Sequence, residues 1–294
     1  MWYKKNQDEI LNNEFTCTRL ITDPNNKSLI RGFNSERNPN LAWYLKRDAW
    51  NDDGRNYRSC FLVKEKNKIV LYFSLQCGLL FKCHEKQIQG IIHKESAGET
   101  RYYIKDDILD VTQVVPGVEL GHFCINDSYR KRKKEWKVQH GIAVYTVGAY
   151  VFYKFIAPKV KEIAEVAGSQ FLYLFCADDG TNRLLDYYVN TLNFSIMDNM
   201  ACVRSTFDRG LTCLTIKMER LKDDLALFND MEKAEKIMDY LHCNNSINIY
   251  QARREFNVEA PYLLFNYLVE HEFASVVTVT TDGKIVKIKK QDRQ

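Results

Sequence analysis

The segment Val118-Glu119-Leu120-Gly121-His122-Phe123-Cys124-Ile125 decides how the chain is interpreted. Its apolar side chains predict a β-strand that ends at Asn126-Asp127-Ser128. An acidic residue inside an apolar strand costs free energy unless it is paired, which favours a functional role for Glu119 beside a purely structural one.

Downstream of this strand, a basic stretch precedes a predicted helix. Residues 130 to 137 carry six positive charges and one Glu. Gly141-Ile142-Ala143 predicts the start of a helix that runs to about Ala167, with Gly168 as its C′ residue and a kink or break at Pro158. The basic stretch is open to three interpretations: a solvated loop, a contact for cofactor phosphates, or a contact for an RNA backbone.

The next elements continue an alternation of strands and helices. The apolar run Phe171 to Ala177 predicts a strand buried on both faces, and a helix is expected from about Asn182 to Leu192. Residues 200–206 and 211–218 predict a terminal hairpin.

Upstream, a strand from Phe15 to Ile21 precedes a helix from Asn40 to Trp50. Two β-rich runs follow, Tyr57 to Val63 and Ile69 to Phe81, and the polar segment from about 82 to 117 predicts a functional insertion. This mixed order predicts an α/β (α+β) layer architecture.

Length and charge indicate two parts. The chain has 294 residues, 45% of them apolar and 27% charged, which suits one large domain or two ordinary ones. The net charge of +4 combines +7 over residues 1–222 with −3 over residues 223–294. We therefore expect a boundary between Lys222 and Asp223, and the overall charge is too small for a dedicated nucleic-acid coat.

The cysteines and the apolar runs bear on location and on metals. Nine cysteines, an odd number, lie mostly in apolar runs and predict reduced side chains in a cytoplasm. Cys77, Cys83, His84 and His93 lack paired ligand spacing, so no metal site is expected. No run reaches the length of a membrane span.

The C-terminal residues, 223–294, are similar to a small winged helix-turn-helix domain. Helices are expected over 231–241, 247–256 and 260–271, followed by a hairpin around Asp282-Gly283. No Lys or Arg occurs from Glu255 to Gly283. Because a recognition helix needs cations or amides for phosphates and bases, we expect protein contact or dimerisation rather than duplex DNA.

The order of these elements resembles the GNAT superfamily of N-acetyltransferases over roughly residues 14 to 220. The residues that carry the resemblance are Val118 to Ile125, Gly141 to Ala143, Phe171 to Ala177, Tyr187 to Phe194, Ala42 to Ala49, Phe61 to Val63 and Ile69 to Leu75. The resemblance implies a central mixed sheet flanked by helices, with acetyl-CoA as co-substrate and no metal. The N-terminal half is most similar to toxin-type acetyltransferases, some of which acetylate aminoacyl-tRNA.

The resemblance also implies site residues. Glu119 would act as a base through water, and Tyr188 as the acid, although Val189 occupies the usual slot and core packing is the alternative for Tyr188. The cofactor would be bound by Ile125, Arg130, Val138, Gln139, His140, Gly141, Ile142, Ala143 and Asn182. Val138 stands where the family has Arg or Gln, and the alternative for Gly141 is a residue that only caps a helix.

The prediction is therefore an acetyl-CoA-dependent N-acetyltransferase acting on a primary amine of a small molecule, a protein or an aminoacyl-tRNA. The alternative is a non-catalytic acyl-CoA sensor or scaffold that acts through its winged-helix domain.

Overall fold

The computed structural model describes residues 15–83, 111–130, 137–176, 181–197, 200–201, 212–244, 246–279 and 286–290. The chain forms two compact units. The sheet unit comprises Glu14–Glu135 and Lys154–Met218, and the helix unit comprises Met1–Asn13, Trp136–Tyr153 and Glu219–Gln294. The expected boundary at Lys222 and Asp223 falls inside one continuous helix, α9 (Met218–Asn244).

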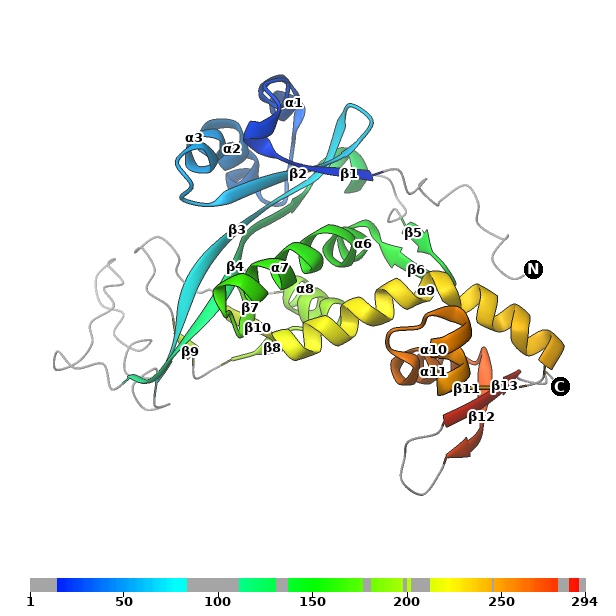
Figure 1. The fold of residues 1–294 in the computed structure, drawn as a ribbon. Coiled ribbons are helices and arrows are strands. Elements are labelled where there is room, and N and C mark those ends of the chain that lie inside the picture. Colours follow the sequence, from blue (N-terminus) through cyan, green and yellow to red (C-terminus); the bar gives the residue numbers. More distant parts are fainter. Residues whose placement is uncertain are drawn as a thin grey trace. The chain divides into compact units, whose positions relative to one another are not determined.

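The sheet unit is built on a mixed sheet, which confirms the predicted mixed α/β architecture (Figure 1). The described strands have the order β1-β2-β3-β4-β7-β10-β8, and β9 pairs with β3. The described pairings are antiparallel except that of β4 with β7, which is parallel. The strands are β1 (Phe15–Arg19), β2 (Ser59–Glu65), β3 (Lys68–Cys83), β4 (Val111–Ile125), β7 (Phe171–Cys176), β8 (Ser195–Ile196), β9 (Met200–Ala201) and β10 (Thr212–Lys217).

Two sequence predictions for these strands are wrong. The two ends of the expected insertion belong to strands, because β3 and β4 stay paired as far as Lys82 opposite Gln113. Residues 84–110 of the expected insertion lie outside the described part. The expected hairpin over 200–218 is not formed by its described residues. Instead β9 pairs with β3, and β10 lies between β7 and β8.

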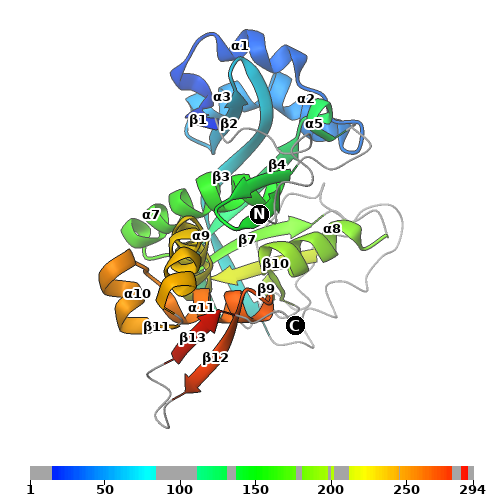
Figure 2. The same cartoon turned by 90° about the vertical axis from the view of Figure 1, so that its right-hand side faces the viewer.

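Helices cover both faces of this sheet (Figure 2). The expected helix over 40–50 is two helices, α2 (Pro39–Arg47) and α3 (Ala49–Gly54), whose buried side chains pack with Cys60, Leu62 and Tyr72. Phe61 points to the opposite face because side chains alternate along a strand, and Lys159 Nζ of α7 (Ala157–Ala167) lies 4.8 Å above its ring. The other short helical segments are η2 (Leu20–Thr22), α1 (Asn26–Leu29), η3 (Ile30–Gly32), α5 (Asp127–Arg130), α8 (Arg183–Asp186) and η5 (Tyr187–Thr191).

The helix expected from Gly141 begins later. Strands β5 (Lys137–His140) and β6 (Ala143–Thr146) form an antiparallel hairpin. Helix α6 (Val147–Val151) follows, and at its start Thr146 Oγ1 accepts a hydrogen bond from the Ala149 amide. The helical path continues through a π-helical turn, η4 (Phe152–Ile156), into α7, so the helix type changes just before Pro158, where a kink or break was predicted. Gly168 ends α7 in the left-handed conformation, also as predicted.

The helix unit follows the expected order after α9. The elements are β11 (Ser246–Asn248), α10 (Ile249–Phe256), α11 (Pro261–Glu270), β12 (Ala274–Val279) and β13 (Val286–Lys290), with sheet order β11-β13-β12. Asn248 and Gln251 form a capping box that starts α10, and Asn257 ends it with φ +53°. The expected turn at Asp282-Gly283 lies outside the described residues.

Candidate functional site

The central feature of the sheet unit is a fork between its two parallel strands. Strands β4 and β7 pair at only three positions, and the last is Glu119 opposite Tyr173. Beyond that point, the described residues of β4 continue paired with β3, while those of β7 continue paired with β10. The two facing strand edges therefore separate from Glu119 onward.

Glu119 lies at the apex of this fork and is buried, with 7% of its surface exposed. Its Oε2 accepts a hydrogen bond of 2.8 Å from Gln76 Nε2 on β3 and one of 3.4 Å from the Tyr173 hydroxyl on β7. The three side chains share one face of the sheet because Gln76, Glu119 and Tyr173 are direct neighbours in register. Among the described residues, two neutral donors thus hold the acidic side chain singled out in the sequence.

Two glycines make room for the Tyr173 side chain. A Cβ at Gly78 would lie 1.9 Å from the Tyr173 hydroxyl, and one at Gly117 would lie 2.9 Å from its ring. Because these distances are below van der Waals contact, only glycine at both positions lets the ring lie across the strands toward Glu119.

A bulge at Gly121 brings a second group of polar side chains beside Glu119. The register shifts between Ser74 opposite His122 and Leu75 opposite Leu120, which leaves Gly121 as the extra residue. A Cβ on Gly121 would lie 2.7 Å from Arg58 Nη1, 3.3 Å from Ser74 Oγ and 3.5 Å from Glu119 Oε1. The site therefore joins a carboxylate, a guanidinium and a hydroxyl around one glycine.

The contacts of His122 define its tautomer. Its Nδ1 lies 3.2 Å from Arg58 Nη1 and 2.7 Å from the buried Ser74 hydroxyl. A guanidinium can only donate, so Nδ1 accepts and the ring proton is on Nε2. The Tyr44 ring stacks on the imidazole with centroids 3.9 Å apart.

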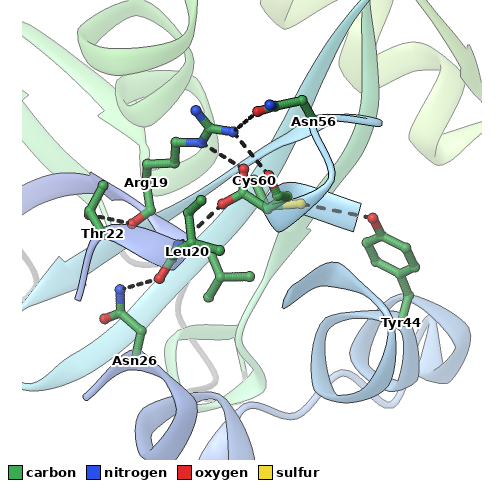
Figure 3. Close-up of polar contacts among 9 residues, drawn as sticks. Arg19, Leu20, Thr22, Asn26, Tyr44, Asn56 and Cys60 are labelled. Carbon is green, nitrogen blue, oxygen red and sulfur yellow. Dashed lines mark hydrogen bonds and ion pairs between the residues drawn. The ribbon is translucent and has the colours of Figure 1, made fainter. Parts of the chain in front are cut away.

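Tyr44 links this group to helix α3. Its hydroxyl donates to Asp52 Oδ2 at 2.9 Å and lies 3.8 Å from Cys60 Sγ, the contact drawn in Figure 3. Burial, with the nearby Cys60 thiol and the bond to Asp52, raises the pKa of Tyr44 well above its usual value. Burial also raises the pKa of the Cys60 thiol to about 12, so both groups hold their protons at neutral pH.

A separate polar network anchors α3 to the first strand (Figure 3). Arg19 Nε forms a 2.7 Å ion pair with the fully buried Asp53, and Arg19 Nη2 reaches Asn56 Oδ1 at 2.8 Å. Asp53 Oδ2 also accepts from the Ile21 amide. This network fixes the loop that leads from α3 to Arg58.

Tyr188, the predicted acid, lies in an aromatic cluster. Its ring is 5.7 Å from Phe194, 5.8 Å from Tyr187 and 6.4 Å from Phe123 of β4, and the residue is 7% exposed. It belongs to the π-helical turn η5, in which an α-helical count does not give the correct side-chain direction. Asn193 follows in the left-handed conformation, with φ +59°.

The predicted phosphate cradle has a different structure from the one expected. Residues Val138 to Ala143 form the β5–β6 hairpin, not a loop that opens a helix. Gly141 has φ +56°, and a Cβ there would lie 1.8 Å from the Met231 carbonyl oxygen of α9. Val138 and Ala143 are buried, and Ile142 packs against the same core as Met231. The glycine therefore serves a tight turn and close packing in the helix unit.

Two further residues of the predicted cradle make local contacts. Gln139 Nε2 donates to the Gly141 carbonyl at 3.1 Å. His140 is buried, stacks on Phe228 with centroids 4.0 Å apart, and places Nε2 2.9 Å from the Phe228 carbonyl and Nδ1 3.4 Å from Glu232 Oε1. These contacts tie the hairpin to α9.

The remaining predicted cofactor residues lie in the sheet unit. Ile125 is the last residue of β4, opposite Leu71, and Arg130 is the last residue of α5. Asn182 is the N-cap residue of α8 with φ +57° and makes no side-chain capping bond. Ile125 thus lies on the strand that forms one arm of the fork.

Five members of the site were not predicted from the sequence: Arg58, Ser74, Gln76, His122 and Tyr173. They come from four segments that meet only through strand pairing. The available signals were polar residues inside apolar runs, such as Ser74 and Gln76 in β3, together with three glycines in neighbouring strands.

Searches for metal and membrane features give no candidates. Within the described residues, no group of three or more His, Cys, Asp or Glu side chains is placed to hold a metal ion. Of the suggested cluster, Cys77 is exposed, while His84 and His93 lie outside the described part. No described helix combines the length and apolar character needed to cross a bilayer.

No protein-family model and no curated protein sequence matches this chain. Solved structures that overlap with it include AtaTR bound with AcCoA (13% identity, 71% of this chain and 96% of that chain, TM-score 0.44). Others are the KacTA–DNA complex (13%, 74% and 99%, 0.43) and AtaT complexed with acetyl-methionyl-tRNAfMet (11%, 71% and 98%, 0.44). Identities this low and TM-scores below 0.5 assign neither a family nor a function to the chain.

Proposed function

We propose that the chain is an acetyl-CoA-dependent N-acetyltransferase that transfers an acetyl group to a primary amine. The observation that carries the proposal is the fork between β4 and β7, with the buried Glu119 carboxylate at its apex. Backbone N–H and C=O groups on separating strand edges can bind an extended chain as an added strand would. The pantetheine arm of coenzyme A is such a chain, and it would bring its thioester toward Glu119.

Glu119 supplies the base in this proposal. An ammonium group must lose a proton before its nitrogen can attack the thioester, and a carboxylate can take that proton through a bridging water. Gln76 and Tyr173 hold the carboxylate in one orientation, which keeps it directed at the same point in each turnover. The departing thiolate needs a proton in return, and Tyr188 is the proposed donor.

The first test replaces Glu119 with Gln, which preserves shape and removes the base. Thiol release from acetyl-CoA with a panel of primary amines should fall by about 10²- to 10⁴-fold in kcat. Tyr188→Phe should lower turnover less, because water can protonate a thiolate. The matched control is Glu235→Gln on the exposed side of α9, which should behave as wild type. Undiminished turnover in Glu119→Gln and Tyr188→Phe would rule out these roles.

A second candidate is a non-catalytic acyl-CoA sensor or scaffold. The observation that favours it is the use of Val138 to Ala143 in packing against α9, which removes the cradle predicted for the pyrophosphate. The two candidates differ in one result. A sensor binds acetyl-CoA in a calorimetric titration but releases no thiol with any amine. An enzyme binds acetyl-CoA and also releases thiol when a suitable amine is present.

We further propose that the C-terminal elements are a winged helix with a role in protein contact or dimerisation. Support comes from the order α9-β11-α10-α11-β12-β13 and from the absence of Lys and Arg in α11. A helix without cations or amide-rich ends gives little attraction for phosphates. Specific binding of duplex DNA at physiological salt would contradict this role.

A further inference from the structure

We propose that Arg58 is a recognition residue for a carboxylate, which, on the proposed function, belongs to the acceptor amine. The acceptor would then be an amino acid or a similar amine with a free carboxylate close to the reacting nitrogen. This inference rests on the proposed function for the identity of the ligand, but the carboxylate site itself is argued from the geometry around Arg58.

Arg58 has unused binding capacity. A guanidinium carries five N–H donors. Among the residues that the structure describes, Arg58 makes one hydrogen bond, to His122 Nδ1, and no ion pair. Its side chain is half-buried, so the charge is only partly solvated. A half-buried guanidinium with free donors is suited to bidentate binding of a carboxylate.

Three neutral side chains fix the position of Arg58. His122 accepts at Nδ1 and is therefore neutral, and Ser74 shares the same nitrogen. Tyr44 stacks on the imidazole, and burial keeps its hydroxyl protonated. These three groups orient the guanidinium without forming an ion pair with it, and Glu119 is the charged group beside it.

The spacing between Arg58 and Glu119 defines the class of acceptor. Arg58 Nη1 and Glu119 Oε1 lie 2.7 and 3.5 Å from the same point beside Gly121, so the two atoms are at most about 6 Å apart. An amine that reaches Glu119 through one water and a carboxylate at Arg58 must then belong to one compact group. An α-amino or β-amino carboxylate fits this spacing, and a long diamine offers nothing to Arg58.

The first arm of the test measures binding alone. N-acetylglycine carries the carboxylate and no amine, so its binding does not depend on acetyl transfer. We expect a chemical-shift or calorimetric titration to show binding to the wild-type chain and at least tenfold weaker binding to Arg58→Gln, since a hydrogen-bonded charge pair is lost. Arg58→Lys should be intermediate, because it keeps the charge but not the planar fork. The control Arg55→Gln changes an exposed neighbour and should bind as wild type.

The second arm compares glycine with glycinamide as acceptors in the thiol-release assay. Arg58→Gln should lower kcat/KM for glycine about tenfold more than it lowers kcat/KM for glycinamide, because only glycine carries the carboxylate. Equal N-acetylglycine binding by wild type and Arg58→Gln, or an equal effect on both acceptors, would overturn the inference. If N-acetylglycine binding needs Arg58 but no amine is acetylated by the wild-type chain, the carboxylate site stands and the proposed function fails.

Discussion

At the scale of single residues, the candidate site depends on small side chains as much as on charged ones. Gly78 and Gly117 let the Tyr173 ring reach Glu119, and Gly121 lets Arg58 approach the same carboxylate. None of these three glycines is required by a positive φ angle, so space is the reason for each. Their role could not be inferred from the sequence, because it depends on contacts between strands that are distant in the chain.

A substitution at Gly121 tests this arrangement. In Gly121→Ala the new Cβ would approach Arg58 Nη1 to 2.7 Å, and the guanidinium must move away because it is the flexible end of its side chain. We expect severalfold weaker binding of N-acetylglycine with a change in unfolding free energy below about 1 kcal/mol.

The control for this substitution is Gly32→Ala in η3, where an added Cβ meets nothing within 4 Å. That variant should bind as wild type and match or slightly exceed its stability. Unchanged binding by Gly121→Ala would show that Gly121 does not position Arg58.

At the scale of elements, the sequence predicted the central strands and the order of the C-terminal helices well. Strand β7, for example, is predicted from the apolar run Phe171 to Ala177, which is bounded by polar residues. This is a local signal that does not depend on tertiary contacts. The segment around Gly141 was misassigned because Gly-x-Ala fits two structures. It can open a helix, or its glycine can take the first position of a two-residue hairpin turn, where φ is positive. Packing against Met231 selects the hairpin, and that contact is not visible in the sequence.

The candidate site was predicted only in part for a related reason. Glu119 stands out because it is acidic within an apolar strand, whereas Gln76 and Ser74 are ordinary polar residues until β3 pairs with β4. Tyr188 was proposed from the resemblance, one residue before the usual slot, and it lies in the π-helical turn η5, where α-helical spacing does not give the side-chain direction. Predicting the whole site would have required the register between strands and the type of helix at Tyr188, which the residue types alone do not give.

The junction between α9 and α11 offers a test at this scale. Asp230 is fully buried, and its two carboxylate oxygens accept from the Glu259 amide at 3.0 Å and the Ala260 amide at 2.7 Å, while Lys233 Nζ lies 2.9 Å away. The carboxylate thereby caps α11, whose own N-cap residue, Ala260, has no capping side chain.

Asp230→Asn keeps the shape but can accept with only one atom, so one buried amide loses its partner. We expect the helix unit to lose about 1 to 3 kcal/mol of unfolding free energy. Chemical denaturation of the full chain, followed by hydrogen exchange in α11, measures this loss. Asp239→Asn on the exposed face of the same helix is the control and should change stability little. Equal stability of the two variants would contradict the capping role.

At the scale of the whole molecule, the proposed chemistry resides in the sheet unit. The fork is formed by β4 and β7, Glu119 lies on β4, and Arg58 is the residue before β2. The helix unit contains the β5–β6 hairpin, whose residues were expected to bind the cofactor phosphates. These residues instead pack against α9. The net charge of +4 is the sum of +7 over residues 1–222, which include the sheet, and −3 over residues 223–294. Helix α11, in the second part, carries no Lys or Arg.

The most direct test of the fork as the acyl-CoA site is hydrogen–deuterium exchange with and without acetyl-CoA. We expect slower exchange in peptides covering Leu120 to Ile125 of β4 and Leu174 to Cys176 of β7, the two edges that separate beyond Glu119. Peptides from β1 and β2 should not change. If saturating acetyl-CoA leaves the exchange of both fork edges unaltered, the fork is not the acyl-CoA site.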